Sequence, residues 1–152
     1  MQYLTFFLNG VEYAVSVNIV ETVVEQSETM AVPTPVEYMK GVMNLRGQVI
    51  PVIDLRKKFG LPPSEDAEKA CVIVFSVAGS DSGRSALGAL VDKVSEVITI
   101  DENSIEYSTA EGVELWERYV RGIVRLTGEH MVVLIEDEAL FSTRELKELH
   151  AV

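Results

Sequence analysis

The chain has 152 residues, 47% of them hydrophobic, which suits one domain or two small lobes that share a core. Its 24 acidic and 13 basic residues give a net charge of −11. Such a surface repels phosphate backbones and anionic lipids, so nucleic acid and the membrane surface are poor candidates as direct partners. No window approaches the roughly 18 apolar residues of a membrane helix, and the N-terminus lacks the basic residues of a signal peptide. We therefore expect a soluble, cytoplasmic protein.

Side chains that carry catalysis or bind metals are few. The only cysteine, Cys71, lies in an apolar run and cannot form an internal disulfide, which fits a reducing compartment. The two histidines, His130 and His150, have no cysteine or aspartate at ligand spacing. No HExxH, CxxC, GxSxG or GxGxxG pattern occurs. The sequence therefore predicts no enzymatic activity, no metal and no cofactor.

The first part of the chain consists mainly of strand-forming residues, in short runs separated by turn residues. The Asn9-Gly10 dipeptide is typical of a tight hairpin turn. Asp54 is predicted to cap the helix that follows it. In chain order we expect strands over Tyr3–Leu8 and Val11–Val17, a continuation at Val23–Val24, a helical turn over Val36–Lys40 after Pro33 and Pro35, strands over Val42–Leu45 and Val49–Leu55, and a helix over Leu55–Phe59 that ends at Gly60.

A polar stretch from Ser64 to Lys69 is typical of a linker, and a second β-rich part follows it. The glycines of the tip at Gly79–Gly83 lack the Gly-Lys-Ser/Thr ending of a phosphate loop. The expected elements are strands over Cys71–Val77, Ala86–Val91 and Val94–Ile100, an irregular acidic segment over Asp101–Arg118, a hairpin of Tyr119–Leu126 and His130–Ile135 around Gly128, and a helix over Asp137–Leu149.

Three segments recur in the same order in the second part, which indicates an internal repeat. The matching pairs are Leu4–Gly10 with Ile73–Gly79, Val17–Val24 with Val91–Ile98, and Gly41–Gly47 with Gly122–Gly128. We infer two related β-lobes, divided near residues 60 to 70, within one domain over residues 1–152, with the C-terminal helix packing across the lobes. The run Val49–Ile53 is apolar on both faces, which favours strands covered on both sides.

The tetrapeptide Asn44-Leu45-Arg46-Gly47 is the strongest candidate for a functional site. Arg46 lies between two apolar strands, and its guanidinium must reach solvent or a carboxylate because a buried unpaired charge is costly. Gly47 favours a sharp turn. Two interpretations stay open from these residues alone: a hairpin turn with a solvated arginine, or a site where Arg46 pairs with an acid.

The longer run from Gly41 to Leu55, GVMNLRGQVIPVIDL, resembles the signature of the CheW family, the coupling proteins of bacterial chemotaxis. The resemblance continues at Ala31–Pro35, Val91–Ile98, Gly122 and Leu134–Ile135. It implies a mainly β fold, with two five-stranded SH3-like barrels around a shared hydrophobic core, short helices and a C-terminal helix. It also implies a non-catalytic adaptor that links the cytoplasmic tip of methyl-accepting chemoreceptors to the regulatory domain of the histidine kinase CheA.

The resemblance assigns expected roles to individual residues. Those near the receptor groove are Arg46, Leu45, Val20 and Gly41. Positions that match receptor or kinase coupling more weakly are Gly88, Val94 and Val97. The structural positions of the motif are Asn44, Gly47, Pro51, Asp54, Gly122 and Gly128.

One departure from the family concerns the partner of Arg46. The family often has an acid two residues after the position of Val20, and this chain has Thr22 there, with Glu21 beside it. Either Glu21 pairs with Arg46, or Arg46 is left for a partner carboxylate. In a strand, Glu21 and Thr22 would face opposite sides.

Three other hypotheses remain. The chain could serve a different kinase pathway as a CheW-like domain. It could be a small-ligand-sensing β-barrel protein that uses the groove between its lobes. It could also be a fragment of a longer protein, such as the kinase itself, although the initial Met and the C-terminal helix favour a complete chain.

Overall fold

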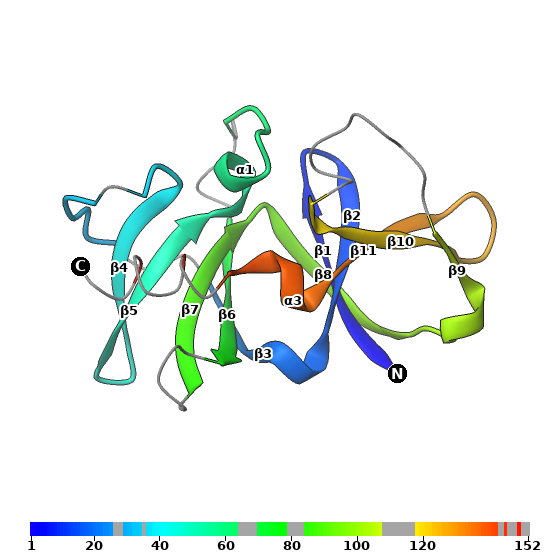
Figure 1. Cartoon of the computed structure of the whole chain (residues 1–152), viewed down its shortest axis with the longest axis horizontal. Helices are drawn as coiled ribbons and strands as arrows, with labels where there is room; N and C mark the ends of the chain where they lie inside the picture. The colour runs from blue at the N-terminus through cyan, green and yellow to red at the C-terminus, as the bar shows by residue number, and fades with distance from the viewer. Residues whose placement is uncertain are drawn as a thin grey trace.

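The computed structural model describes residues 1–25, 29–34, 36–63, 70–78, 84–107, 118–142, 145 and 149. Two β-sheets lie side by side, with short helices between them (Figure 1). The strands are β1 (Gln2–Leu8), β2 (Val11–Ser16), β3 (Val20–Glu25), β4 (Met39–Leu45), β5 (Gln48–Asp54), β6 (Cys71–Ala78), β7 (Arg84–Val91), β8 (Lys93–Thr99), β9 (Ile105–Glu106), β10 (Val120–Arg125) and β11 (Met131–Ile135). The helices are η1 (Val17–Ile19), α1 (Leu55–Lys58), η3 (Glu102–Ser104) and α3 (Asp137–Leu140). The mainly β fold predicted from the sequence is confirmed.

Each sheet forms one lobe. The six-strand lobe has the order β8-β1-β2-β11-β10-β9, and the five-strand lobe has the order β3-β6-β7-β5-β4. Neighbouring strands are antiparallel except for one parallel pair in each lobe, β2 with β11 and β5 with β7. In β5, this parallel register begins at Val52, directly after Pro51, which has no N–H to donate.

The two lobes are not the two halves of the chain, so the expected division near residues 60 to 70 is wrong. Strands β6 and β7 follow that stretch, yet they pair with β3 and β5 in the five-strand lobe. The first hairpin, β1–β2, pairs instead with β8 and β11 in the six-strand lobe. The chain therefore crosses between lobes at η1 and returns at Asp92, and these crossings are set by long-range strand pairing that no local pattern encodes.

The internal repeat is visible in the strand order. Replacing β8, β1, β2, β11 and β10 by their sequence equivalents β3, β6, β7, β5 and β4 converts the order of the six-strand lobe, apart from its edge strand β9, into that of the five-strand lobe. The first repeat thus contributes a hairpin to the six-strand lobe and three strands to the five-strand lobe, and the second contributes a hairpin to the five-strand lobe and three equivalent strands plus β9 to the other. The sequence matches were sound, but the lobes form by exchange between the repeats.

Three apolar clusters hold the molecule together. One lies inside the six-strand lobe and includes Ile100 and Leu134, and one lies inside the five-strand lobe and includes Ile50 and Val52. The largest, the shared core, lies between the lobes and takes residues from both sheets and from both α-helices. In β5, Val52 points into its own lobe and Ile53 into the shared core. This confirms the expected shared core and the strands covered on both faces.

The remaining differences from expectation are local. The helical turn expected over Val36–Lys40 is a short turn that leads into β4 at Met39. The expected helix over Asp137–Leu149 is interrupted after α3, because Phe141 has extended backbone angles (φ −135°, ψ 125°). Glu145 and Leu149 are again helical, and the other residues after 142 in this stretch lie outside the described part. The acidic segment after Asp101 contains η3 and β9. The expected linker and the tip at Gly79–Gly83 lie outside the described residues. No described helix is long and apolar enough to span a membrane.

Candidate functional site

The turn between β4 and β5 presents Arg46 to solvent. Arg46 and Gly47 have positive φ angles of 51° and 84°, the combination typical of a type I′ hairpin turn. The side-chain oxygen of Asn44 accepts a hydrogen bond from the Gly47 N–H at 3.0 Å, which fixes the turn. Arg46 is exposed and forms no ion pair with any residue that the structure describes. The turn therefore places Arg46 at the exposed end of a hairpin.

The segment that carries Glu21 is a strand. Along β3, Val20 and Thr22 are half-buried while Glu21 is exposed, so successive side chains alternate between the two faces. Among the described contacts, no ion pair joins Glu21 to Arg46. The pairing of Glu21 with Arg46, one of the two alternatives above, is therefore not found among the described residues.

The predicted valines lie on the outer strands of the two sheets. Val20 at the start of β3 and Val94 at the start of β8 are both half-buried and pack against the shared core. Val97 lies further along β8 and is 53% exposed. Leu45 packs instead against the interior of the five-strand lobe. The structure thus brings Val20 and Val94 to the same core, and no described contact connects them with Arg46.

Three of the glycines are required by packing. A Cβ on Gly41 would lie 2.1 Å from the Met30 carbonyl oxygen, and a Cβ on Gly122 would lie 2.7 Å from the Glu106 carbonyl oxygen. These two glycines are equivalent in the repeat, and each lets a neighbouring segment approach its strand closely. Gly88 is buried, with the Val72 side chain 2.9 Å from its Cβ position. A partner could sense Gly41 or Gly88 only through the packing around them.

The remaining motif residues have local structural roles. Asp54 accepts hydrogen bonds from the Arg56 and Lys57 N–H groups at 3.1 and 3.5 Å and so caps α1, as predicted. Gly128 has a positive φ of 73° in the turn between β10 and β11.

The sequence did not predict the contact between α1 and Asp92, the residue at which the chain returns to the six-strand lobe. Arg56 donates two hydrogen bonds to the Asp92 carboxylate, at 2.7 and 2.5 Å. Asp92 also accepts from the Asn9 N–H at 2.8 Å. Burial raises the pKa of the Asp92 carboxyl, but the hydrogen bonds from Arg56 and Asn9 outweigh it and the pKa is lowered. The only sequence signal was a charged pair, Asp92-Lys93, between apolar strands.

Lys58, also on α1, is enclosed almost completely. Its side chain is 2% exposed, and its ammonium lies 4.6, 5.6 and 4.9 Å from the ring centres of Tyr38, Tyr119 and Phe141. It forms an ion pair with Glu145, which also accepts a hydrogen bond from the Tyr38 hydroxyl. Burial lowers the pKa of Lys58. Burial also acts to raise the pKa of Glu145, but the hydrogen bonds from Lys58 and Tyr38 prevail and lower it.

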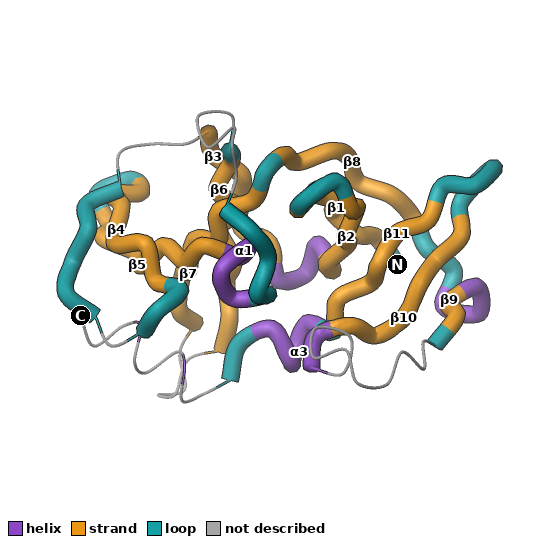
Figure 2. The backbone as a smooth tube through the Cα atoms, turned by 90° about the horizontal axis from the view of Figure 1, so that it is seen from above, coloured by secondary structure: helices purple, strands orange, loops and turns teal. Residues whose placement is uncertain are grey.

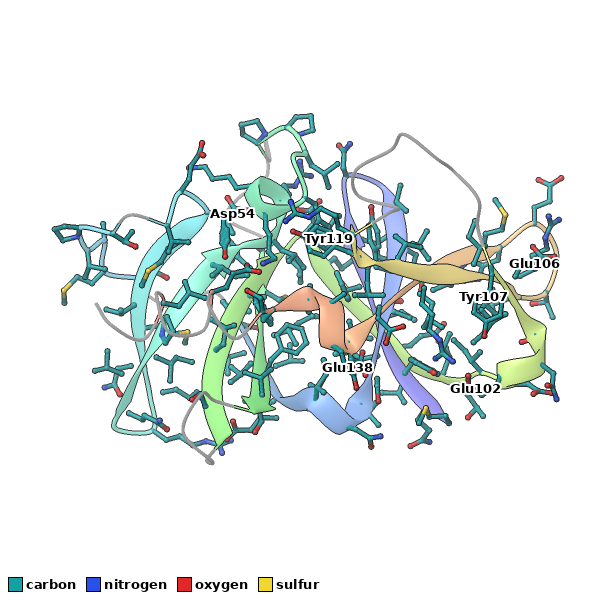
Figure 3. All side chains as sticks on the ribbon, in the orientation of Figure 1. Asp54, Glu102, Glu106, Tyr107, Tyr119 and Glu138 are labelled. Atoms are coloured by element: carbon teal, nitrogen blue, oxygen red, sulfur yellow. The ribbon has the colours of Figure 1, made fainter. Side chains whose placement is uncertain are left out.

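A cleft of about 530 Å³ lies beside this cluster. Figure 3 shows Tyr119 near α1 and Glu138 further away on α3. Two of the charges that line the cleft, Lys58 and Glu145, are already paired with each other. The lining residues are Glu37, Tyr38, Lys57, Lys58, Arg118, Tyr119, Ser142 and Glu145.

Two β-lobes that exchange hairpins around one core, with an arginine displayed on a hairpin turn, define a CheW-like protein. The chain belongs to the CheW family: the model of the CheW-like domain matches residues 2–145. A probable chemotaxis protein CheW from Rhizobium etli is 33% identical over 95% of this chain and 89% of its own length. The chemotaxis protein CheW from Bacillus subtilis is 39% identical over 73% of this chain and 67% of its own length.

A solved structure shares the fold. The scaffolding protein TtCheW from Thermoanaerobacter tengcongensis superposes with a TM-score of 0.74 at 32% identity, over 89% of this chain and 88% of that one. The two-lobed arrangement expected from the family resemblance is therefore confirmed at the level of the fold.

Proposed function

We propose that this chain is a chemotaxis adaptor that couples chemoreceptors to the histidine kinase CheA without catalysing a reaction itself. The observation that carries the proposal is the family match over residues 2–145, together with relatives that are named as chemotaxis protein CheW. The partners are the regulatory domain of CheA and the cytoplasmic tip of methyl-accepting receptors. A cytoplasmic location follows from these partners.

Arg46 is the residue to which we assign partner contact. It is exposed, its backbone is fixed by the Asn44 side chain, and it forms no ion pair with the described part of the chain. An exposed guanidinium on a fixed turn is accessible for a bidentate pair with a carboxylate of a partner. We assign Val20, Leu45, Val94 and Val97 to the surfaces around partner contacts.

Reconstitution tests both the function and the residue. Purified chain, CheA and receptor in nanodiscs are combined, and receptor-dependent kinase activity is measured. We expect the wild-type chain to be required, and Arg46→Glu to weaken coupling about tenfold, equivalent to about 1.4 kcal/mol. The matched control is Arg125→Glu, because the Arg125 side chain is 68% exposed and its only described ion pair is on the surface.

Different outcomes would contradict the role of Arg46 and the adaptor function. If Arg46→Glu has the wild-type melting temperature and couples normally, the role of Arg46 is wrong. If the wild-type chain does not couple receptor to kinase, the adaptor function is wrong.

A small-ligand-sensing function has weaker support. The cleft beside Lys58 is large enough for a metabolite, but two of the charges that line it, Lys58 and Glu145, are paired with each other. A thermal-shift screen against metabolites gives stabilisation only if this second function holds.

A further inference from the structure

Helix α1 lies between the two lobes, and nearly every residue of it contacts a different part of the molecule. Figures 1 and 2 both place it between the sheets, together with α3. Leu55 is fully buried in the shared core. Phe59, which follows the helix, stacks on Tyr119 with ring centres 4.9 Å apart and lies 5.9 Å from Tyr13. Both tyrosines belong to the side of the six-strand lobe, whereas α1 continues directly from β5 of the other lobe.

Arg56 connects α1 to the point where the chain returns to the six-strand lobe. The Asp92 carboxylate receives the guanidinium of Arg56 and the N–H of Asn9, from the turn of the first hairpin. The Asp92 N–H donates to the Phe7 carbonyl at 3.1 Å. One bidentate ion pair thus ties β5, the end of β7 and the β1–β2 hairpin together, and a bidentate pair restrains direction as well as distance.

Lys58 makes the second connection. Tyr38 comes from the segment before β4, in the five-strand lobe, and Tyr119 immediately precedes β10, in the six-strand lobe. Phe141 and Glu145 bring in the segment after α3. A nearly fully buried ammonium that loses its carboxylate is left uncompensated, so separating Lys58 from Glu145 is costly.

The second repeat has an equivalent helix, α3, which extends from the six-strand lobe towards the five-strand lobe. α3 continues from β11 of the six-strand lobe, and its Asp137 carboxylate accepts the Ser16 N–H at 3.3 Å, next to the first crossing. Phe141 then packs edge-on against Phe75 of the five-strand lobe. Each crossing is therefore contacted by one helix, the first by α3 and the second by α1. Among the contacts of the described residues, the bidentate ion pair and the buried ammonium belong to α1.

We propose that α1, through Arg56 and Lys58, fixes the angle between the two lobes and so positions the surfaces by which partners engage each lobe. The first part concerns the chain alone, and the second rests on the proposed adaptor function. Arg56 and Lys58 are positioning residues: they touch no partner but set where partner-contacting residues on the two lobes stand.

Lobe orientation is measured directly by backbone residual dipolar couplings in the full chain. In the wild type, one alignment tensor should fit amides of both lobes. Lys58→Met keeps the apolar stem but removes the charge that Glu145 and Tyr38 surround, and we expect the lobes to require two different tensors. The matched control is Lys57→Met, since Lys57 is the neighbouring lysine on the same helix and is exposed; it should keep one tensor.

A second variant helps to distinguish a change in lobe orientation from loss of the fold. Arg56→Lys keeps the charge and loses the paired hydrogen bonds to Asp92. Its two lobes should also require different alignment tensors, and these should differ less than in Lys58→Met. Measurements are made well below each variant's melting temperature. If Lys58→Met and Arg56→Lys both keep a single tensor with the wild-type orientation, or if Lys57→Met changes it equally, α1 does not set the angle.

The kinase reconstitution separates this inference from the adaptor function. We expect Lys58→Met to reduce receptor-dependent kinase activity at least several-fold, while Lys57→Met does not. If Lys58→Met changes the lobe orientation but leaves receptor-dependent kinase activity unchanged, α1 does not position the partner-binding surfaces. Failure of the wild-type chain to couple overturns the adaptor function and leaves the tensor result for α1 standing.

Discussion

Gly41 and Gly47 occupy the same hairpin but are required for different reasons. A Cβ on Gly41 would meet the Met30 carbonyl oxygen at 2.1 Å, with φ at +154°, whereas nothing lies within 4 Å of the Cβ position of Gly47, at φ +84°. Gly41→Ala should cost about 3 kcal/mol or more, because the backbone at Met30 must move. Gly47→Ala should cost about 1 kcal/mol, for strain alone. Urea unfolding of the two variants gives the comparison, and equal losses would contradict it.

Asp137 carries a charge at a site that disfavours it. Burial raises its pKa, and Glu136 and Glu138 act in the same direction against the Ser16 N–H and Arg121. A carboxyl with a raised folded pKa stabilises the fold at low pH and loses that contribution as the pH rises through the folded pKa. Asp137→Asn should therefore raise the melting temperature at pH 7.

The advantage of Asp137→Asn should shrink as the pH falls through the raised pKa towards the ordinary value of 3.8. Melting curves from pH 3 to pH 8 measure it. Glu138→Gln is the comparison, since Glu138 is exposed on the same helix (Figure 3) and acts on Asp137 only through its charge, so that its gain should be smaller. A gain that is independent of pH, or as large for Glu138→Gln, would show that charge burial at Asp137 is not the cause.

At the scale of elements, the cap of α1 has a measurable role. Asp54 satisfies two N–H groups of a helix of only four residues. Asp54→Ala should cost about 1 kcal/mol in chemical unfolding. The comparison is Asp101→Ala, which removes the analogous 3.0 Å bond to the Asn103 N–H at the surface helix η3. α1 lies between the lobes, whereas η3 lies at one end of the molecule. A larger loss of stability for Asp101→Ala than for Asp54→Ala would therefore refute the importance assigned to α1.

Elements with local signals were predictable from the sequence. The Asn9-Gly10 and Gly47 turns, the cap at Asp54 and most strands follow from residue types within a few positions of each other. The break after α3 was not, because Phe141 takes extended angles where the helical spacing continues. The Lys58 cluster was not predictable either, since its members come from four separate stretches and meet only after folding. Arg46 was found because its motif is contiguous.

The whole molecule should not divide at the stretch between Leu61 and Ala70. Each lobe contains strands from both sides of it, and the shared core joins residues such as Phe6 and Phe75. Fragments 1–63 and 70–152 should each be largely unfolded alone and should fold when mixed. Amide spectra of each fragment and of the mixture test this. A fragment 70–152 that shows a dispersed spectrum by itself would contradict the exchange of hairpins as a requirement for folding.

The two lobes have corresponding strand orders apart from β9, and this has a consequence for the origin of the chain. Each repeat gives its hairpin to the lobe built by the other repeat, which is the geometry of a domain-swapped dimer. Here the two subunits of such a dimer are joined end to end in one polypeptide, so the swapped partner is always present at high effective concentration. Duplication and fusion of one half-length gene would produce this arrangement in a single step. After fusion, the two copies could diverge independently, as shown by Arg46 in one copy and Thr127 at the matching position of the other.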